Sequence, residues 1–207
     1  MLAASLLSEE IKTVLATSKD IEAAVAGIER IFRDVSSEFG GLVELLDAEG
    51  LRGVEQRLSN AYLVHIMGTD LNPLIRDFFG RIIDSRNIMS LFKYQRLNSK
   101  TAPVFIPGGS IALARLQEII KKDDIFAVTS LIREVTGIKA EKPDPTLVES
   151  SLYKGITRFL RKTGKHPFGV GPIMDYLWRC SIEAMNLCVL FYGKDLERDA
   201  VTAELVH

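Results

Sequence analysis

The sequence predicts an all-α protein. Apolar residues recur with the period of a helix along nearly the whole chain, and Asn72-Pro73 and Asp144-Pro145 are typical helix starts. No stretch alternates with period 2 over a length that would indicate a strand. With 207 residues and 47% hydrophobic content, the chain can form one large domain or two small ones with a sizeable core.

Capping residues and helix breakers divide the chain into successive helices. The expected helical segments are residues 6–16, 20–39, 42–46, 53–67, 73–97, 110–121, 124–135, 144–164 and 172–193, followed by a short amphipathic tail at 197–206. Two of these starts leave alternatives open. The second segment begins after Ser18 or Asp20, and the seventh after Asp123 or Asp124.

Residues 73–97 are expected to form the central helix. Its apolar residues cover more than half of the helix surface, a pattern typical of a helix that is buried on several sides. They are Ile75, Phe78, Phe79, Ile82, Ile83, Ile88, Leu91 and Phe92. The long irregular segment at 98–109 follows, and Val104-Phe105-Ile106 predicts that it packs as an apolar plug. Ser110 is then expected to cap the next helix.

The last long helix follows a proline, Pro172, that suits its first position. It presents apolar residues at helical spacing, namely Ile173, Leu177, Cys180, Ala184, Leu187 and Phe191. The single tryptophan, Trp178, is expected in the core. Gly193 ends this helix.

Two parts of the chain resemble each other. Asn87 and Asn186 each begin the pattern Asn-(Ile/Leu)-x-x-Leu-Phe, and Val54 and Val148 each begin the upstream pattern Val-Glu-x-x-Leu. Two motifs repeated in the same order at nearly the same spacing predict an internal duplication. We expect an N-terminal helical segment or degenerate repeat at 1–49, a first helical repeat unit at 50–140 and a second at 141–207, with the second boundary inside 138–143.

An asparagine within the apolar stripe of each copy is the unusual feature. An amide in such a place costs about 1–3 kcal/mol unless its hydrogen bonds are made. Two interpretations are open for Asn87 and Asn186. Each amide is a bonded core group that ties its helix to a neighbouring loop carbonyl, or it lines a shared socket with polar edges.

Composition and motifs exclude several classes of protein. The formal net charge is −1, which provides no bulk attraction to nucleic acid or anionic lipid. No run reaches the roughly 18 apolar residues of a membrane span, and the N-terminus lacks the basic region of a signal peptide. Cys180 and Cys188 lie about 12 Å apart along one expected helix, too far for a disulfide. We therefore expect a reduced, cytoplasmic protein.

The sequence contains no pattern for catalysis, a metal or a cofactor. It lacks the glycine motifs of nucleotide-binding proteins and the nucleophile elbow, and no Cys or His pair has metal-ligand spacing. The Pro107-Gly108-Gly109 stretch could seat an anion before a helix, but no basic residue lies inside it, which favours a simple turn. We expect no catalytic residue, no cofactor and no metal.

The residues already named resemble the pattern of a known family. The motif D-x-x-N-I at Asp84, followed by F-I-P-G-G at Phe105, is similar to a pattern in the C subunit of archaeal and bacterial A/V-type rotary ATPases, a relative of the d subunit of the vacuolar ATPase. Y-L at Tyr176, E-x-x-N-L at Glu183 and G-K at Gly193 resemble that family's closing motif. The resemblance extends over about residues 50–200.

This resemblance implies a funnel of repeated helical bundle units that sits on the membrane rotor ring and holds the foot of the central shaft. The protein would couple the shaft to the ring during ATP-linked proton or sodium transport, at the cytoplasmic face and without membrane insertion or an active site. The residues expected to line the shaft socket are the polar edges of the two repeated helices: Arg86, Asn87, Ser90, Lys93, Arg179, Glu183 and Asn186.

The chain departs from the family pattern in length and in charge. Family members are usually longer, Ser181 stands where a second acid is common, and Met185 and Cys188 stand where basic residues usually flank the asparagine. The inner face would therefore carry less charge. Two alternatives stay open: a free-standing helical adaptor or regulatory protein that shares the scaffold, and a small helical enzyme or ligand-binding protein.

Overall fold

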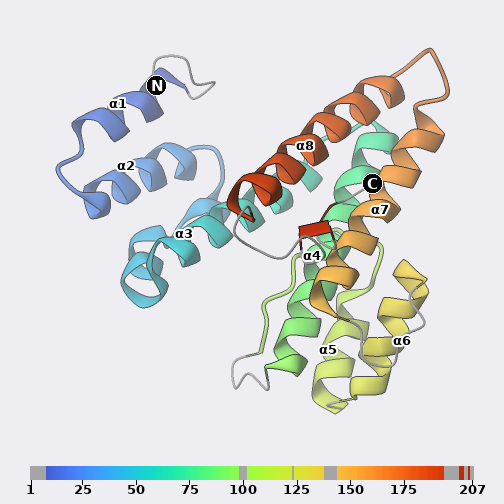
Figure 1. Cartoon of the computed structure of the whole chain (residues 1–207). Helices are drawn as coiled ribbons and strands as arrows, with labels where there is room; N and C mark the ends of the chain where they lie inside the picture. The colour runs from blue at the N-terminus through green and yellow to red at the C-terminus, as the bar shows by residue number, and fades with distance from the viewer. Residues whose placement is uncertain are drawn as a thin grey trace. The chain divides into compact units, whose positions relative to one another are not determined.

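All regular structure in the described part of the chain is helical, as the sequence predicts (Figure 1). The computed structural model describes residues 8–97, 102–122, 124–137 and 144–193, together with 201, 202 and 205. The helices are α1 (Glu9–Thr17), α2 (Ile21–Arg33), the 3-10 helix η2 (Ser37–Phe39), α3 (Leu42–Met67), α4 (Pro73–Arg96), α5 (Leu113–Lys122), α6 (Ile125–Thr136), α7 (Pro145–Thr163) and α8 (Gly171–Tyr192). The prediction of an all-α fold is confirmed.

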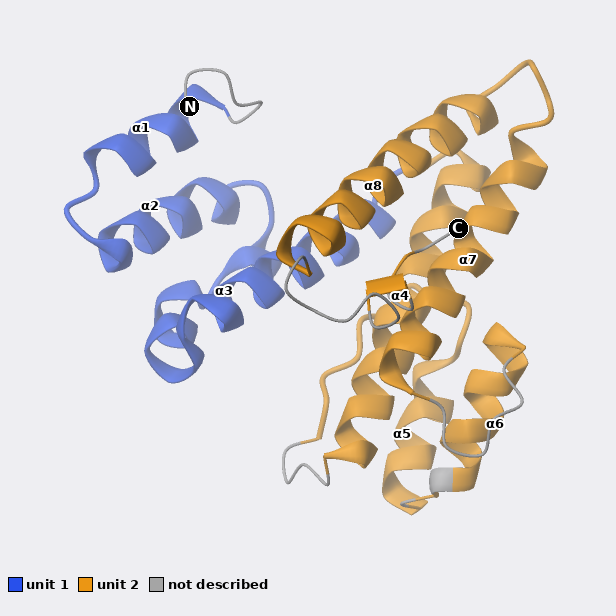
Figure 2. Ribbon diagram, viewed as in Figure 1, with its two compact units in different colours: residues 1–70 blue, residues 71–207 orange. Residues whose placement is uncertain are grey.

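The chain divides into two compact units, residues 1–70 and residues 71–207 (Figure 2). The repeat boundaries predicted near residues 50 and 140 concern an internal duplication rather than compactness, and they stay a prediction. The second of these boundaries, at 138–143, lies outside the described residues, as does most of the tail at 197–206.

The first unit is built on the packing of α2 against α3, where Val25, Leu42 and Val54 form the buried cluster. The N-terminus of α3 has no side-chain cap of its own, because its N-cap residue is Gly41. Glu29 of α2 supplies the acceptors instead: its carboxylate receives the backbone N–H groups of Gly41 at 3.0 Å, Leu42 at 2.9 Å and Val43 at 3.2 Å. A carboxylate at this end of a helix also meets the favourable end of the helix dipole.

The Glu29 carboxylate is held in its charged form. Burial raises its pKa, but the three backbone N–H donors and the guanidinium of Arg33 more than offset this effect, so that its pKa lies below the ordinary value for a glutamate. Arg33 donates to the same carboxylate at 2.9 Å. Glu29 therefore joins α2 to α3 as an ion.

Two features of the first unit concern helix ends. α2 stops at Arg33, so the predicted extension to Phe39 is wrong: the chain turns back, and the Phe39 ring stacks on Phe32 with centroids 5.1 Å apart. The break predicted between the segments 42–46 and 53–67 is present as a kink inside α3 at Gly50, whose backbone has a positive φ of 70°.

The second unit is organised around α4, which packs against α6 and α7, while α7 also packs against α8 (Figure 1). One buried cluster joins the C-terminal half of α4 to α5, α6 and the start of α7; among its fully buried members are Ile88, Leu91, Leu116, Leu131 and Val148. A second cluster joins α7 to α8 around Trp178. The central position predicted for residues 73–97 is thus confirmed.

Trp178 lies in the core, as predicted. Its indole N–H donates to the hydroxyl of Thr157 at 2.8 Å, and its ring meets Phe78 edge to face with centroids 5.7 Å apart. These contacts connect α8 with both α7 and α4. A tryptophan that is buried and hydrogen-bonded contributes much apolar area without leaving its polar atom unpaired.

Candidate partner-binding surface

Two side chains one helical turn apart on α4 hold the segment that follows this helix. Asn87 makes a reciprocal pair with Ile106: its amide nitrogen donates to the Ile106 carbonyl at 2.8 Å, and its amide oxygen accepts from the Ile106 N–H at 2.8 Å. Asn87 is 1% exposed. Both backbone groups of a buried loop residue are thereby satisfied by one side chain.

Asp84 holds the next part of the same segment. Its carboxylate accepts the backbone N–H groups of Ser110 and Ile111, each at 3.0 Å, and the Ser110 hydroxyl also donates to it. Ser110 therefore does not cap a helix as predicted, and α5 begins at Leu113. The sequence-based assignment was wrong because Asp84, 26 residues earlier in the chain, binds both the backbone N–H and the hydroxyl of Ser110 and so holds this residue in the turn before the helix.

The turn approaches α4 closely at Gly109. A Cβ atom at this position would lie 2.2 Å from Oδ1 of Asp84 and 3.2 Å from Cγ2 of Ile83. The turn interpretation of Pro107-Gly108-Gly109 is therefore supported, because this stretch faces a carboxylate and would repel an anion. Phe105 and Ile106 pack inward as predicted, whereas Val104 is 82% exposed and does not belong to the plug.

The structure decides between the two interpretations of Asn87. Its amide is a core group bonded to a loop carbonyl, and both of its polar atoms are used. The proposal that Asn87 lines a socket is corrected accordingly. The side chain is buried and holds Ile106 against α4, and it presents no polar atom to a partner.

The other α4 candidates lie at the surface. Arg86 and Lys93 are exposed and Ser90 is half-buried. Their spacing of four and three residues places all three on one side of α4. Tyr153 of α7 lies near this side, since the charge of Arg86 acts on its hydroxyl. The same hydroxyl donates to Glu149 of α7 at 3.4 Å. Burial raises the pKa of Tyr153, the Glu149 carboxylate raises it further, and the positive charge of Arg86 acts against both.

The α8 candidates lie in the middle and second half of that helix. Arg179 and Glu183 are exposed and Asn186 is half-buried. Arg179 pairs with the buried carboxylate of Asp175 one turn earlier, which leaves Glu183 as the exposed acid of this helix. Asn186 is less buried than Asn87, so the two repeated asparagines have different surroundings. Whether the two copies superpose stays a prediction.

The sequence analysis missed some residues that hold the structure together or lie beside the candidate surface. Asp84 was recognised in a motif but was not assigned a role, although its spacing of three from Asn87 places both on one side of a helix. Glu149 and Tyr153 carried no signal of their own, because their place beside Arg86 depends on the packing of α7 against α4. Glu29 also carried no signal of its own, because its role as the cap of α3 depends on the packing of α2 against α3.

Residues 8–97, 102–122, 124–137 and 144–193 include no group of three or more His, Cys, Asp or Glu placed to hold a metal ion. Within the same residues, no helix is long and apolar enough to cross a membrane. The buried acids and amide that were described above, Glu29, Asp84 and Asn87, all bind backbone groups of their own chain.

Comparison with known proteins identifies the family. The model of the ATP synthase (C/AC39) subunit family matches residues 3–203, which is nearly the whole chain. The chain belongs to the ATP synthase (C/AC39) subunit family. The resemblance seen in the D-x-x-N-I and F-I-P-G-G motifs is thus confirmed, and the structure explains these motifs, because Asp84 and Asn87 bind the backbone of residues 106–111.

Several curated relatives are named as the C subunit of an A-type ATP synthase. The protein of Methanothermobacter thermautotrophicus is 22% identical over 89% of this chain and 53% of its own length. That of Methanosarcina barkeri is 25% identical over 77% and 48%, and that of Methanocaldococcus jannaschii is 24% identical over 87% and 50%. The chain thus spans about half the length of the curated relatives it matches.

Proposed function

We propose that this C/AC39-family chain is a non-catalytic component of an A/V-type rotary ATPase, coupling the central shaft to the membrane rotor ring during ATP-linked proton or sodium transport. The observation that carries the proposal is the family match over residues 3–203, together with relatives named as the C subunit of A-type ATP synthases. Its place would be at the cytoplasmic face of the membrane, bound to the complex rather than inserted in the bilayer.

The shaft-binding surface in this proposal consists of Arg86, Ser90 and Lys93 on α4 and Arg179, Glu183 and Asn186 on α8. Asn87 and Asp84 contribute indirectly by holding the segment at 106–111 against α4. The neutral Met185 and Cys188 limit the charge beside this surface, so binding is expected to be weak, and the four charged residues make it sensitive to salt. Exposed ion pairs at the rim of an interface contribute only about 0–1 kcal/mol each and act mainly on specificity and association rate.

The test uses the central-stalk subunits from the same organism and a double charge reversal, Lys93→Glu with Glu183→Lys. We expect the variant to bind these subunits about 3- to 30-fold more weakly at low salt, a range that corresponds to one or two rim pairs. Circular dichroism should show unchanged helicity, because both side chains are exposed.

A matched control exchanges an exposed ion pair elsewhere in the same unit. Lys122 and Glu118 on α5 form such a pair, with 66% and 61% of their side chains exposed. Glu118→Lys with Lys122→Glu should leave stalk binding unchanged. Binding of the Lys93/Glu183 variant that equals wild type at every salt concentration would contradict the assigned surface, and no binding by the wild type would favour the free-standing adaptor.

A further inference from the structure

Helix α8 carries two apolar stripes, and the structure buries only one of them. Asp175, Trp178 and Ile182 face the core. The other stripe lies on the opposite side and consists of Ile173, Leu177, Cys180, Ala184, Leu187 and Phe191, all of them exposed. Leu187 is 65% and Phe191 is 69% exposed, values that are unusual for large apolar side chains in a helix. We call this set the outer stripe.

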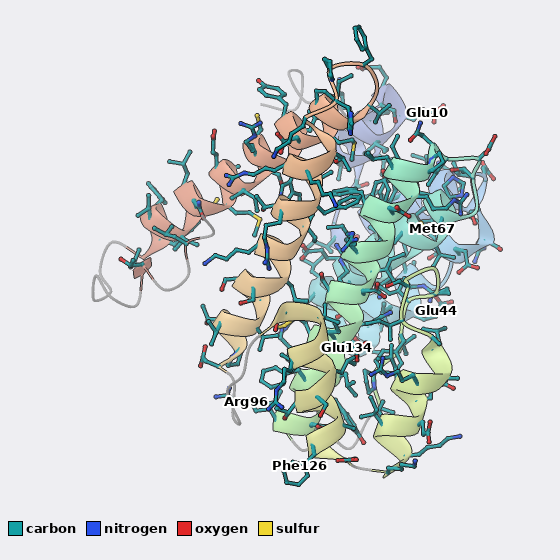
Figure 3. The ribbon with its side chains drawn as sticks, turned by 90° about the vertical axis from the view of Figure 1, so that its right-hand side faces the viewer. Glu10, Glu44, Met67, Arg96, Phe126 and Glu134 are labelled. Atoms are coloured by element: carbon teal, nitrogen blue, oxygen red, sulfur yellow. The ribbon has the colours of Figure 1, made fainter. Side chains whose placement is uncertain are left out.

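The geometry of the helix leaves this stripe uncovered by the described rest of its unit. α7 and α8 diverge from the connection that joins them, in the view of Figure 1 and in the perpendicular view of Figure 3. No buried residue follows Ile182 within α8, so the last ten residues of the helix, 183–192, include none. Apolar area of this extent on one side of a helix is typical of an interaction surface.

The outer stripe has the spacing of a helix–helix seam. Its residues follow one another at steps of 4, 3, 4, 3 and 4, which keeps them on one line over about 27 Å of helix. A position beside the line is also apolar at Tyr176, which is 64% exposed. α8 contains three charged residues, Asp175, Arg179 and Glu183, and none of them lies in the stripe. A partner recognised mainly through charge would not fit this surface.

The outer stripe is complementary in size to the same stripe of a second copy when the two helices run antiparallel. In an antiparallel pair, Ile173 meets Phe191 of the other copy, Leu177 meets Leu187, and Cys180 meets Ala184. Large residues then oppose large ones at both ends, and small residues meet at the centre, where they allow the two helices to approach closely. This arrangement is isologous, since each contact occurs twice around a two-fold axis.

The area is adequate for a weak dimer. Covering the five large side chains, which are the four of the stripe and the flanking Tyr176, on both copies removes on the order of 1,000 Å² from water, the lower limit for a specific interface. We propose that two copies of this chain associate through the outer stripe of α8 as an antiparallel helix pair. Contacts of this size correspond to dissociation constants of about 1–100 µM.

The first test measures the mass of the full chain in solution by sedimentation velocity over a concentration series. The wild type should shift from monomer to dimer in the micromolar range. Leu187→Glu should raise the dissociation constant by at least about tenfold, because the symmetry places two carboxylates into apolar layers. Leu147→Glu is the matched control: Leu147 is exposed on α7 outside the stripe, and its substitution should leave the dimer unchanged.

The second test determines orientation by cross-linking in a chain with Cys180→Ala and Cys188→Ala. Leu177→Cys and Leu187→Cys are introduced in separate chains and treated with a short bis-maleimide. Only the mixture of the two should cross-link, because positions 177 and 187 share a layer in the antiparallel pair. Two copies of either variant alone hold their thiols about 15 Å apart along the axis, since about ten residues separate the layers.

Three results would overturn the proposal. They are a wild type that stays monomeric throughout the concentration series, a dimer that Leu187→Glu does not weaken, and cross-linking of a single variant with itself, which indicates a parallel pair. None of these measurements uses stalk subunits. Failure here therefore leaves the rotary ATPase assignment untouched, and loss of stalk binding does not affect the dimer.

Discussion

Replacing Asn87 by leucine tests the fully buried side-chain connection between α4 and the segment after it. Leucine has a similar volume but cannot bond to Ile106, whose N–H and C=O groups both use the Asn87 amide at 2.8 Å. Two hydrogen bonds are lost, each with a net contribution of about 0.5–1.5 kcal/mol, and the stranded backbone groups carry a desolvation cost of about 1–3 kcal/mol each where no water reaches them. Partial relaxation of the loop lowers the sum. We expect the variant to lose about 2–4 kcal/mol of unfolding free energy.

The assay is equilibrium unfolding in urea followed by tryptophan fluorescence. Trp178 is the single tryptophan and is buried in the unit of residues 71–207, so its emission reports the unit that contains Asn87. With a slope of about 2 kcal/mol per molar urea, the midpoint should fall by about 1–2 M. A matched control is Asn186→Leu: Asn186 is half-buried, and the same substitution there should shift the midpoint less.

One result would refute the reasoning. If Asn87→Leu unfolds at the wild-type midpoint with an unchanged slope, the amide contributes nothing net, and the buried pair with Ile106 does not hold the segment. An altered slope would instead indicate a change in how the unit unfolds. The wild type and the variant would then be compared by the hydrogen exchange rate of the Ile106 amide, which donates to Asn87 in the wild type.

Two further predictions concern close contacts of the backbone. Glu29→Gln should destabilise the unit of residues 1–70 by about 1–2 kcal/mol at neutral pH, because the carboxylate acts as the cap of α3. The pKa of Glu29 is lowered in the folded protein, so the extra stability of the wild type over this variant should be complete at pH values above the ordinary pKa of a glutamate. It should disappear as the pH falls through the pKa of the folded state, as measured by urea unfolding followed by circular dichroism. Gly109→Ala should cost about 1–3 kcal/mol by the same fluorescence assay, because Asp84 must leave Ser110 and Ile111 to admit the methyl group. Gly155→Ala is its control with the opposite sign, expected to stabilise by about 0.5–1 kcal/mol, since no atom lies within 4 Å of the added carbon; equal effects at the two glycines would contradict the steric argument.

Local signals in the sequence located most of the helices. Asp20, Asn72, Asp124 and Asp144 each accept a hydrogen bond from a first-turn N–H, as capping residues should, and the helices that follow begin at the next residue. Apolar periodicity also indicated that α4 is central. These features depend on residues within a few positions of one another, which is why a single sequence was enough to predict them.

The candidate surface was predictable only in part. The repeated Asn motif drew attention to the correct turns of α4 and α8, and one of the two interpretations of Asn87 proved right. The difference between Asn87, which is buried, and Asn186, which is half-buried, could not be read from two nearly identical motifs. It depends on whether another segment, such as the one at Ile106, packs over the amide.

The sequence by itself determined that this chain is helical, where its caps lie and which family it resembles. Only the tertiary structure decided that Ser110 bonds to Asp84, that Glu29 caps α3, and which of the two stripes of α8 is buried. The physical reason is distance along the chain. Helix formation responds to neighbours three and four residues away, whereas these choices depend on partners brought together from a dozen or more residues apart, and helical spacing is the same for a stripe that faces a core and one that faces solvent.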